Sequence, residues 1–400
     1  MRVLIVHNAY QRAGGEDAVV DAEKTLLLRA GNQVSDYLRD NNEIAASRLH
    51  SNIALGVRTV WSSESKNDLF RLLQEWKPDV VHFHNTFPLI SPAAYYACRE
   101  LGLPVIQTLH NYRLFCPSGS FFRDGKVCEE CLDGSPWQAI RHACYRQSRA
   151  ATVAVAAMIS FHHGLGTWMK MVDRYIALSE FSRAKFISAG LPAAKIVVKP
   201  NFVVDDPGVG PQHRDYAVFI GRLSQEKGIA TLVRAWTRVN PGYVLRVVGD
   251  GPLFNALQSE IDGSGVSNVH LLGQLSRAQS MQVLQGAKFL VLPSNCYENF
   301  PMVLAEAYAC GTPVIASRMG AMQEIVKNRH IGLNFNPGDE VDLAEKVEWA
   351  WTHPEDVLRM GANARIEFEA KYTAEKNYTQ LMAIYESVIR EIAVAHKATA

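Results

Sequence analysis

The feature that most constrains this chain is an alternation of short β-branched runs with longer amphipathic stretches, and the alternation occurs twice. In the first half the short runs are RVLIVHN, DVVHFHN and PVIQTLHN, at 2–8, 79–85 and 104–111. In the second half they lie at 216–223, 243–251, 269–275, 287–294 and 312–317. Such runs, separated by helices, form a parallel sheet covered by helices on both faces. The pattern predicts an α/β fold with two Rossmann-like, doubly wound domains that face a cleft.

A segment rich in Pro and Gly separates the two series. Residues 199–215 hold three Pro and two Gly in KPNFVVDDPGVGPQHRD, a composition typical of an interdomain linker. A chain of 400 residues is also long enough for two domains. We therefore expect an N-terminal domain over 1–198, a linker over 199–215 and a second domain over 216–373. A helical tail over 374–400 could pack back on the N-terminal domain.

Charge and hydropathy exclude several classes of protein. The 41 Lys and Arg balance 40 Asp and Glu, so the basic excess of a nucleic-acid-binding protein is missing. The start MRVLIVHNAY has no secretory cleavage site, and no run reaches the roughly 18 apolar residues of a membrane-spanning helix. We expect a cytoplasmic protein that binds no nucleic acid.

Open α/β sheets bind ligands at the carboxyl ends of their strands, so the residues after each run are the candidates. Gly14 and Gly15 follow the first run and precede a helix. A Gly pair lets the backbone approach a phosphate or a sugar, although such pairs are equally common in simple turns. The segment lacks the full G-x-G-x-x-G spacing, which disfavours an NAD-dependent oxidoreductase.

Three histidines lie at neighbouring strand ends in the first half. The strand period of two puts His82 and His84 on one face, next to Asn85, and His110 ends the following run. Structural histidines are the ordinary interpretation of such residues, but three at adjacent strand ends favour a site.

The second half carries cations and Gly-rich loops after its strands. Arg222 and Lys227 flank the turn in GRLSQEKG, and Gly249 lies in VGDGP. An Arg fork and a Lys point charge suit a diphosphate, whereas an exposed turn with solvated cations is the alternative.

The stretch SNCYENFPMVLAEAYACGTPVIAS places Glu298 before a helix and Glu306 in its second turn, with Pro301 at the helix start. A carboxylate suits the vicinal hydroxyls of a sugar because each hydroxyl donates a hydrogen bond. A buried ion pair is the alternative for Glu306, since an unpaired carboxylate in VLAEAYAC would be costly.

In this order, these residues resemble the retaining glycosyltransferases of family four, whose GT-B fold sets two Rossmann-like domains around a sugar-nucleotide cleft. The family's E-x7-E motif matches Glu298 and Glu306, which implies contacts with the donor sugar and the ribose respectively. The resemblance implies catalytic roles for His110, Glu298, Arg222 and Lys227. The implied donor-binding set is Gly14, Gly15, Arg222, Lys227, Gly249, Glu298, Asn299, Phe300 and Glu306; the acceptor-side candidates are His82, His84 and Asn85.

The resemblance also implies the chemistry. The expected donor is a nucleoside-diphosphate sugar of the UDP or GDP type, bound by the second domain, and the expected acceptor is a saccharide or a polyprenyl-linked sugar in cell-surface polysaccharide synthesis. No Asp-x-Asp pair occurs, which agrees with a site without a catalytic metal. The family often has a small residue where this chain has Pro301, which offers no amide donor to the phosphate.

Four cysteines cluster within the insertion over 112–147. Cys116, Cys128, Cys131 and Cys144 have the spacing C-x11-C-x2-C-x12-C, which fits a tetrahedral structural zinc. Free thiols, a disulfide and an iron–sulfur cluster are the alternatives.

The segment 137–185 holds seven Lys or Arg against two acidic residues, with Trp137, Phe161, Trp168 and Met169 between them. That composition could hold the chain on an anionic membrane at the inner face of the cell, or it could be a solvated basic surface. A sugar-nucleotide 2-epimerase of the same fold and a sugar-nucleotide-binding protein without turnover remain the alternative functions.

Overall fold

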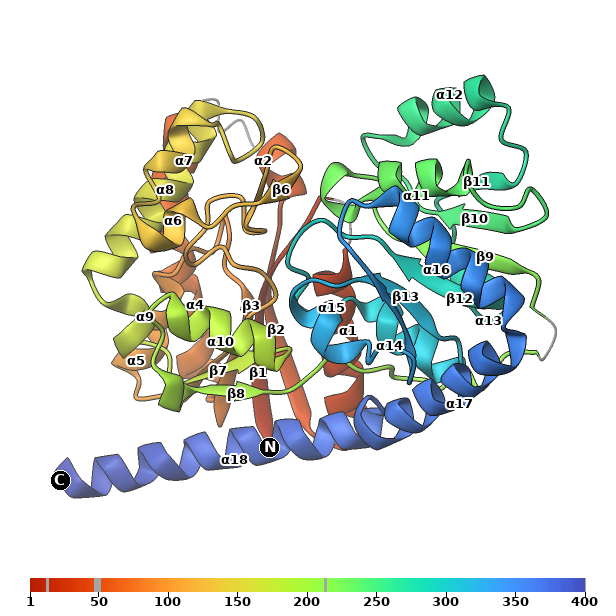
Figure 1. Ribbon diagram of the computed structural model, residues 1–400. Helices are drawn as coiled ribbons and strands as arrows, with labels where there is room; N and C mark the ends of the chain where they lie inside the picture. Colours follow the sequence, from red (N-terminus) through yellow and green to blue (C-terminus); the bar gives the residue numbers. More distant parts are fainter. Residues whose placement is uncertain (12–13, 47–51, 212–213, 400) are drawn as a thin grey trace. The chain divides into compact units, whose positions relative to one another are not determined.

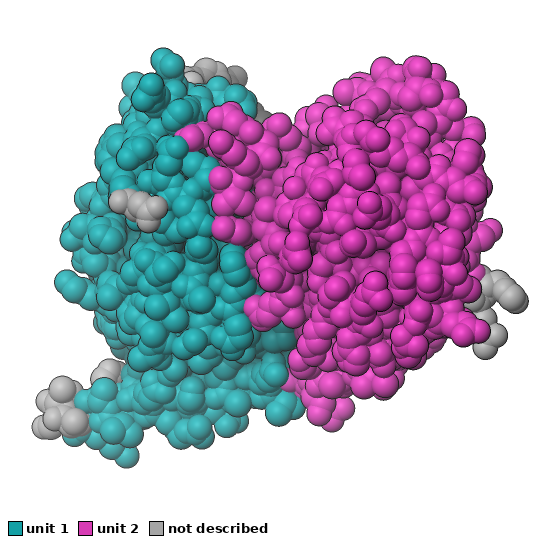
Figure 2. Space-filling view, in the orientation of Figure 1, with its two compact units in different colours: residues 1–121, 128–200, 377–400 teal, residues 122–127, 201–376 magenta. Residues whose placement is uncertain are grey.

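The computed structural model describes residues 1–11, 14–46, 52–211 and 214–399. Contacts divide the chain into two compact units, coloured teal and magenta in Figure 2. The first unit comprises 1–121, 128–200 and 377–400, and the second comprises 122–127 and 201–376. The expected linker is thus divided, with 199–200 in the first unit and its other described residues in the second. Residues 212–213 of that linker lie outside the described residues.

The first unit is built on a six-stranded parallel sheet in the order β2-β1-β3-β4-β7-β8. Its strands are β1 Arg2–Ala9, β2 Gln33–Asp40, β3 Val80–Asn85, β4 Val105–Thr108, β7 Arg174–Ala177 and β8 Ile196–Val198. Its helices are α1 Gly15–Arg29, α2 Asn42–Ala46, α3 Asn52–Val60, α4 Ser63–Trp76, α5 Ala94–Glu100, α6 Glu130–Asp133, α7 Gln138–Arg141, α8 Arg149–Gly164, α9 Thr167–Lys170 and α10 Glu180–Ser188, with a 3-10 turn at Ala193–Lys195.

The second unit has the order β11-β10-β9-β12-β13-β14, also parallel throughout. Its strands are β9 Tyr216–Ile220, β10 Val244–Val248, β11 Val269–Gly273, β12 Ala287–Leu292, β13 Val314–Ser317 and β14 Gly332–Phe335. Its helices are α11 Ile229–Trp236, α12 Phe254–Ser264, α13 Arg277–Gln285, α14 Met302–Ala309, α15 Gly320–Ile325, α16 Glu340–Thr352 and α17 Pro354–Lys371, with a 3-10 turn at Gln225–Lys227. A two-stranded ribbon joins β5 Phe122–Arg123 to β6 Lys126–Val127. The prediction of two doubly wound parallel sheets is confirmed.

The central strands are buried on both faces, their polar residues included. Every residue of β3 is buried, and β1 is buried at all positions but its ends. Helices cover both faces of such a sheet, so neither face of a strand meets water. Each fully buried Val, Leu or Ile contributes about 1.5–3 kcal/mol relative to an exposed one.

The last helix, α18 Ala374–Thr399, supplies apolar side chains to the core of the first unit. Leu381, Tyr385 and Val388 are completely buried there against Val3 and Ile106 of the sheet. It is the long dark-blue helix in Figure 1, and from residue 377 onward it belongs to the first unit. The chain end therefore covers one face of the sheet with which the chain begins.

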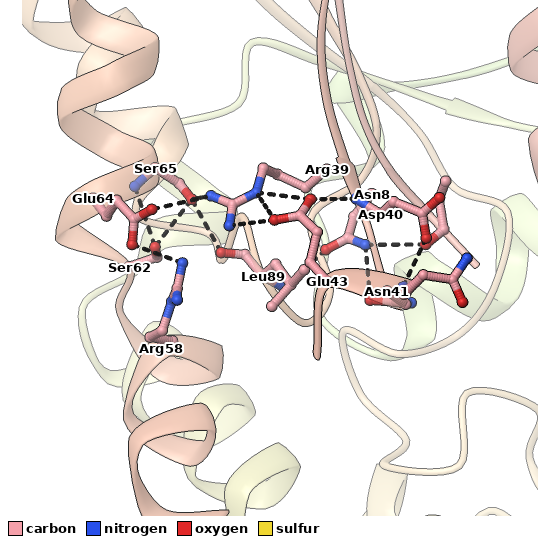
Figure 3. A network of polar contacts seen from close by, with 12 residues as sticks. Asn8, Arg39, Asp40, Asn41, Glu43, Arg58, Ser62, Glu64, Ser65 and Leu89 are labelled. Atoms are coloured by element: carbon pink, nitrogen blue, oxygen red, sulfur yellow. Dashed lines mark hydrogen bonds and ion pairs between the residues drawn. The ribbon is translucent and has the colours of Figure 1, made fainter. Parts of the chain in front are cut away.

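Polar side chains tie together the loops that follow β1, β2 and β3. The amide of Asn8, at the end of β1, donates to Asn41 Oδ1 (3.0 Å) and accepts from the backbone N–H of Leu89 (2.8 Å). Figure 3 shows the adjoining network, in which Arg39 contacts Glu43 (2.9 Å) and Glu64 (3.6 Å), while Arg58 pairs with Glu64 (2.7 Å). These contacts hold the strand ends in one arrangement, which is what a site at the carboxyl edge requires.

Candidate functional site

The strand order of the second unit predicts where a ligand would bind to it. In the strand order 3-2-1-4-5-6, strands 2 and 3 lie on one side of strand 1 and strands 4 to 6 lie on its other side. This reversal of strand order falls between β9 and β12, and ligands bind outside the carboxyl ends of the strands at that point. Arg222 and Lys227 follow β9, while Ser294 and Glu298 follow β12. The fold therefore brings two predicted cations and one predicted carboxylate to the same edge of the sheet.

Two glycines allow these loops to pack closely. A Cβ on Gly228 (φ +68°) would lie 1.8 Å from the carbonyl oxygen of Pro293, which precedes Ser294. A Cβ on Gly249 (φ +137°) would lie 1.9 Å from the carbonyl oxygen of Gly221. Both positions also have positive φ, which strains any other residue. Gly249, predicted as a ligand contact, thus has a packing reason of its own: it lets the loop after β10 approach the Arg222 turn.

Lys227 and Glu298 form an ion pair within this edge. The Lys227 ammonium donates to Glu298 Oε1 at 2.5 Å, and the Ser294 hydroxyl donates to the same oxygen at 2.7 Å. Burial alone would raise the pKa of Glu298, but Lys227 and Ser294 outweigh it and lower that pKa. Burial opposes the Lys227 charge as well, yet Glu298 raises the lysine pKa overall. Both groups are therefore charged at neutral pH.

Arg222 and Glu306 were also predicted from the sequence and belong to the same unit. Arg222 is exposed. Glu306 lies in the second turn of α14, whose N-cap is Pro301. Burial raises the pKa of Glu306, and Arg277, at 3.7 Å, opposes that rise only in part. A long contact to a half-exposed Arg leaves this carboxylate able to accept hydrogen bonds from a ligand.

Phe300 and Asn299, which were predicted to contact the donor, are both buried. Their exposed fractions are 5% and 7%. The Phe300 carbonyl accepts a hydrogen bond from Asn201 (2.9 Å), and its ring lies 5.2 Å from that of Tyr372. The side chain of Phe300 thus contributes to the internal packing of this unit.

In the first unit, the equivalent reversal of strand order lies between β1 and β3. The Gly14–Gly15 turn follows β1, and Asp17 caps it by accepting from the Gly14 N–H at 2.7 Å. Asp17 also contacts His7 Nε2 at 2.8 Å. A second acidic residue, Glu16, stands in the same first turn of α1. Two carboxylates there would repel a negatively charged phosphate. The turn therefore suits the hydroxyl-bearing part of a ligand better than its diphosphate.

Sequence analysis did not single out Glu16. Its Oε2 accepts hydrogen bonds from the Tyr10 hydroxyl (2.9 Å) and the Asn111 amide (3.2 Å), and its Oε1 is buried without a hydrogen-bond partner among the described residues. Burial raises the pKa of Glu16 to about 7, and the His7 and Tyr10 contacts offset that rise only in part. A carboxyl group that titrates near neutral pH can exchange protons with a ligand. The sequence feature that could have identified Glu16 is its position as an acidic residue directly after a Gly pair.

His110 precedes Asn111, the residue whose side-chain amide donates to Glu16. Its Nε2 is 2.9 Å from His84 Nδ1, and the two rings stack at 5.2 Å. Burial holds the pKa of His110 well below its ordinary value, so the ring is neutral at pH 7. His110 and Glu16 thus share one edge of the first sheet.

The three acceptor-side candidates have other roles. His82 is fully buried, and its ring nitrogens contact the Tyr385 and Thr108 hydroxyls, each at 2.8 Å. Asn85 donates to the Asn8 carbonyl (2.8 Å) and accepts from the Phe87 N–H (2.9 Å). His84 is 3% exposed, and its Nδ1 contacts Nε2 of His110, which lies at the edge of the sheet. Strands buried on both faces leave these side chains little exposed surface, and their contact with an acceptor stays a prediction.

The cysteines of the insertion lie in one region. Burial, followed by the thiols of Cys116, Cys144 and Cys128, raises the pKa of Cys131 to about 12. All seven cysteines are free of disulfides. Within the described part of the chain, the metal-type ligands that come within 4.8 Å of one another are instead Glu23, His82 and His84.

Exposed apolar side chains gather on α3 and α8, which pack against each other. Ile53 and Val57 of α3 are 77% and 62% exposed, and Phe161 of α8 is 45% exposed. Trp168, which the sequence grouped with this surface, is buried at 2%. Among the helices of the described residues, none combines the length and the apolar character needed to cross a membrane.

Two family models match adjoining parts of this chain. The model described as Glycosyltransferase Family 4 matches residues 40–206, and the one described as Glycosyl transferases group 1 matches residues 207–367. Their junction lies within the expected linker.

Individual proteins show the same likeness. The chain is 30% identical over 174 residues to an uncharacterised glycosyltransferase of Methanocaldococcus jannaschii, which is 44% of this chain and about half (48%) of that protein. It is 26% identical over 322 residues to a glycogen synthase of Mycobacterium tuberculosis, covering 78% of this chain and 69% of that one. The crystal structure of Anabaena HepE in complex with UDP aligns with a TM-score of 0.69 at 18% identity, over 97% of this chain and 100% of HepE. That last likeness shows a shared fold.

Proposed function

Since two glycosyltransferase family models match residues 40–206 and 207–367 of this chain, we propose that it transfers a hexose from a nucleoside-diphosphate sugar to a saccharide or lipid-linked acceptor, with retention of configuration. The observation that carries this proposal is the Lys227–Glu298 ion pair at the strand reversal of the second sheet, with Arg222 in the same loop as Lys227. Two cations and an ionised carboxylate there match the two halves of such a donor, a diphosphate and a sugar with vicinal hydroxyls.

In this proposal the ion pair changes partners when the donor binds. The Lys227 ammonium turns to the diphosphate together with Arg222, and Glu298 then accepts hydrogen bonds from sugar hydroxyls. As the bond between the sugar and the diphosphate breaks, negative charge grows on the leaving oxygen, and the two cations stabilise it. The freed diphosphate oxygen accepts the proton of the attacking hydroxyl on the same face of the sugar, which retains the configuration.

Three further residues are proposed to contact the substrates, one in the second unit and two in the first. Glu306 is a carboxylate with only a 3.7 Å contact to Arg277 and suits the ribose hydroxyls. In the first unit, neutral His110 and the protonatable Glu16 are proposed to contact the sugar or the acceptor hydroxyl. We expect a uridine or guanosine donor and give UDP priority because HepE, a protein of the same fold, was crystallised with it.

We propose a lipid-linked acceptor of cell-surface polysaccharide synthesis because of the surface on α3 and α8. Ile53, Val57 and Phe161 expose apolar area there, and the neighbouring segment 137–185 has an excess of five cations, from seven basic and two acidic residues. Apolar side chains flanked by cations bind anionic membrane surfaces. Peripheral binding at the inner face would bring the enzyme to such an acceptor.

We also propose that Cys116, Cys128, Cys131 and Cys144 bind a structural zinc. Their spacing fits four thiolate ligands, and the effect of the Cys116, Cys144 and Cys128 thiols on the pKa of Cys131 supports the proposal. When bound, zinc would stabilise the insertion, and with four thiolates it would leave no open position for catalysis.

The experiment that tests the function is a transfer assay with the full chain. UDP- and GDP-hexoses are offered with short saccharide or polyprenyl-phosphate-linked acceptors, and NMR reads the anomeric configuration of the product. The proposal predicts turnover with one donor and an unchanged configuration. Lys227→Met should abolish most turnover, whereas Lys346→Met, which removes another ion-paired lysine of the same unit, should not. An inverted product, or equal rates in both variants, would contradict the proposal.

A further inference from the structure

A buried serine and a lysine bind the same oxygen of Glu298. Ser294 follows β12 and is 3% exposed, and its hydroxyl donates to Glu298 Oε1 at 2.7 Å. The Lys227 ammonium donates to that oxygen as well, at 2.5 Å. Neither contact uses Oε2. Two donors, one charged and one neutral, therefore hold the carboxylate by one of its oxygens.

Main-chain contacts on both sides of Ser294 fix it to the turn that carries the lysine. The backbone N–H of Asn295 donates to the carbonyl oxygen of Glu226 at 2.8 Å. The carbonyl oxygen of Pro293 lies so near to Gly228 that a Cβ on this glycine would come within 1.8 Å of it. These contacts involve no part of the lysine side chain. The serine therefore keeps its place when that side chain turns to another partner.

The proposed function gives this second hydrogen bond a task. When the sugar donor binds, the lysine leaves Glu298 for the diphosphate. Burial raises the pKa of Glu298, and the contacts with Lys227 and Ser294 lower it. Once the lysine has turned away, the hydrogen bond from the serine still opposes the effect of burial. A hydrogen bond to a charged group favours the charged form by roughly tenfold to a hundredfold.

The other titratable groups beside this pair cannot replace the serine. Burial raises the pKa of the Cys296 thiol, which therefore stays neutral. The Glu226 carboxylate accepts a hydrogen bond from the Ser224 hydroxyl at 2.5 Å and carries the same charge as Glu298. Arg222 is assigned to the diphosphate, like the lysine. A neutral hydroxyl that stays in place is thus the group suited to hold Glu298 while the donor is bound.

We propose that Ser294 is a positioning residue that holds Glu298 by Oε1 in the donor-bound enzyme and so presents Oε2 to the hydroxyls of the donor sugar. This role rests on the proposed function, because only there does Lys227 leave the carboxylate. The serine keeps the carboxylate in the orientation that the ion pair sets in the free enzyme. A preset carboxylate does not need to reorganise when the sugar arrives.

A purely structural serine is the competing explanation, since any buried hydroxyl needs a hydrogen-bond partner. The neighbouring strand offers a matched control. Ser317 ends β13 and is completely buried, and its hydroxyl has no hydrogen-bond partner among the described residues. Ser317→Ala therefore removes a buried hydroxyl from an adjacent strand end of the same sheet. An effect on Glu298 that this control does not reproduce belongs to the hydrogen bond from Ser294.

The test is a 13C NMR titration of the Glu298 carboxyl in the full chain, with the signal assigned from Glu298→Gln. Ser294→Ala should make Glu298 a roughly tenfold to hundredfold weaker acid, and Ser317→Ala should leave its midpoint unchanged. The decisive comparison uses the Lys227→Met background, which imitates the departure of the lysine. Ser294→Ala should weaken the acid there by at least as much. No effect in that background would overturn the proposal, because the serine would then hold the carboxylate only while the lysine is present.

Kinetics test the consequence for transfer, with the UDP- or GDP-hexose that the wild type turns over. The kcat of Ser294→Ala should fall roughly tenfold to a hundredfold at about pH 5 and less at about pH 8, because kcat reports the donor-bound enzyme and Glu298 is ionised again at the higher pH. Ser317→Ala should stay within about twofold of wild type at both. An equal loss at both pH values would overturn the positioning role. If the wild type turns over no hexose donor, the proposed function fails by itself, and the NMR titration still decides whether Ser294 holds Glu298.

Discussion

Replacing Glu16 by Gln should make the chain's stability less dependent on pH. Burial raises the pKa of this carboxyl to about 7, against an ordinary value of 4.5 in the unfolded chain. Because the folded state holds the proton more tightly, Glu16 contributes stability below pH 4.5 and loses it as the pH rises through 7. At ~1.4 kcal/mol for each tenfold change in proton affinity, the loss amounts to about 3 kcal/mol. Gln cannot ionise, so the variant escapes that loss.

Calorimetric melting of wild type and Glu16→Gln at pH 4 and pH 8 measures the effect. The two proteins should differ little at pH 4, while at pH 8 the variant's first unit should melt higher by about 6–12 °C for a unit of this size. Glu75→Gln is the matched control, since Glu75 is an exposed carboxyl of the same unit. A 13C titration of the Glu16 carboxyl should give a midpoint near 7. A midpoint below 5, with no pH dependence in the melting difference, would refute the burial argument.

Three further predictions concern the proposed site, the metal and the membrane. Glu298→Gln should lower kcat/KM about 100- to 1,000-fold with an unchanged circular dichroism spectrum, since one preorganised polar contact is typically worth that much; a loss below tenfold would remove Glu298 from the site. Freshly purified protein should contain one zinc per chain by elemental analysis. The Cys131→Ser variant should lose this zinc, whereas Cys98→Ser, which changes a buried cysteine elsewhere, should keep it. Zinc well below one per chain in the wild type would contradict the four-cysteine site. Ile53→Glu with Phe161→Glu should reduce sedimentation with phosphatidylglycerol vesicles at least tenfold; equal sedimentation of parent and variant would exclude this surface.

The sequence predicted the architecture because the signals for it are local. The run over 2–8 has four consecutive apolar residues, 3–6, which indicates a strand buried on both faces, and the structure has β1 there. The position of Glu298 before a helix and of Glu306 in its second turn also followed from a local pattern, with Pro301 at the helix start.

Partners far apart in the chain could not be predicted in the same way. Spacing put His82 and His84 on one face of a strand, but the side chains that enclose them come from α1 and α18, about 60 and 300 positions away in the chain. Lys199 looked like part of a linker and is instead one half of a buried ion pair with Glu23. Such pairings depend on helix packing around the sheet, which a period of two or 3.6 does not encode.

Calorimetric titration of the full chain with UDP, GDP, ADP and their sugars tests the central claim most directly. The account predicts that one nucleotide series binds with a stoichiometry of one, and that Lys227→Met weakens this binding roughly tenfold to a hundredfold while Lys346→Met leaves it unchanged. Absence of binding by every nucleotide, or equal affinity in wild type and Lys227→Met, would contradict a donor site at the strand reversal of the second unit.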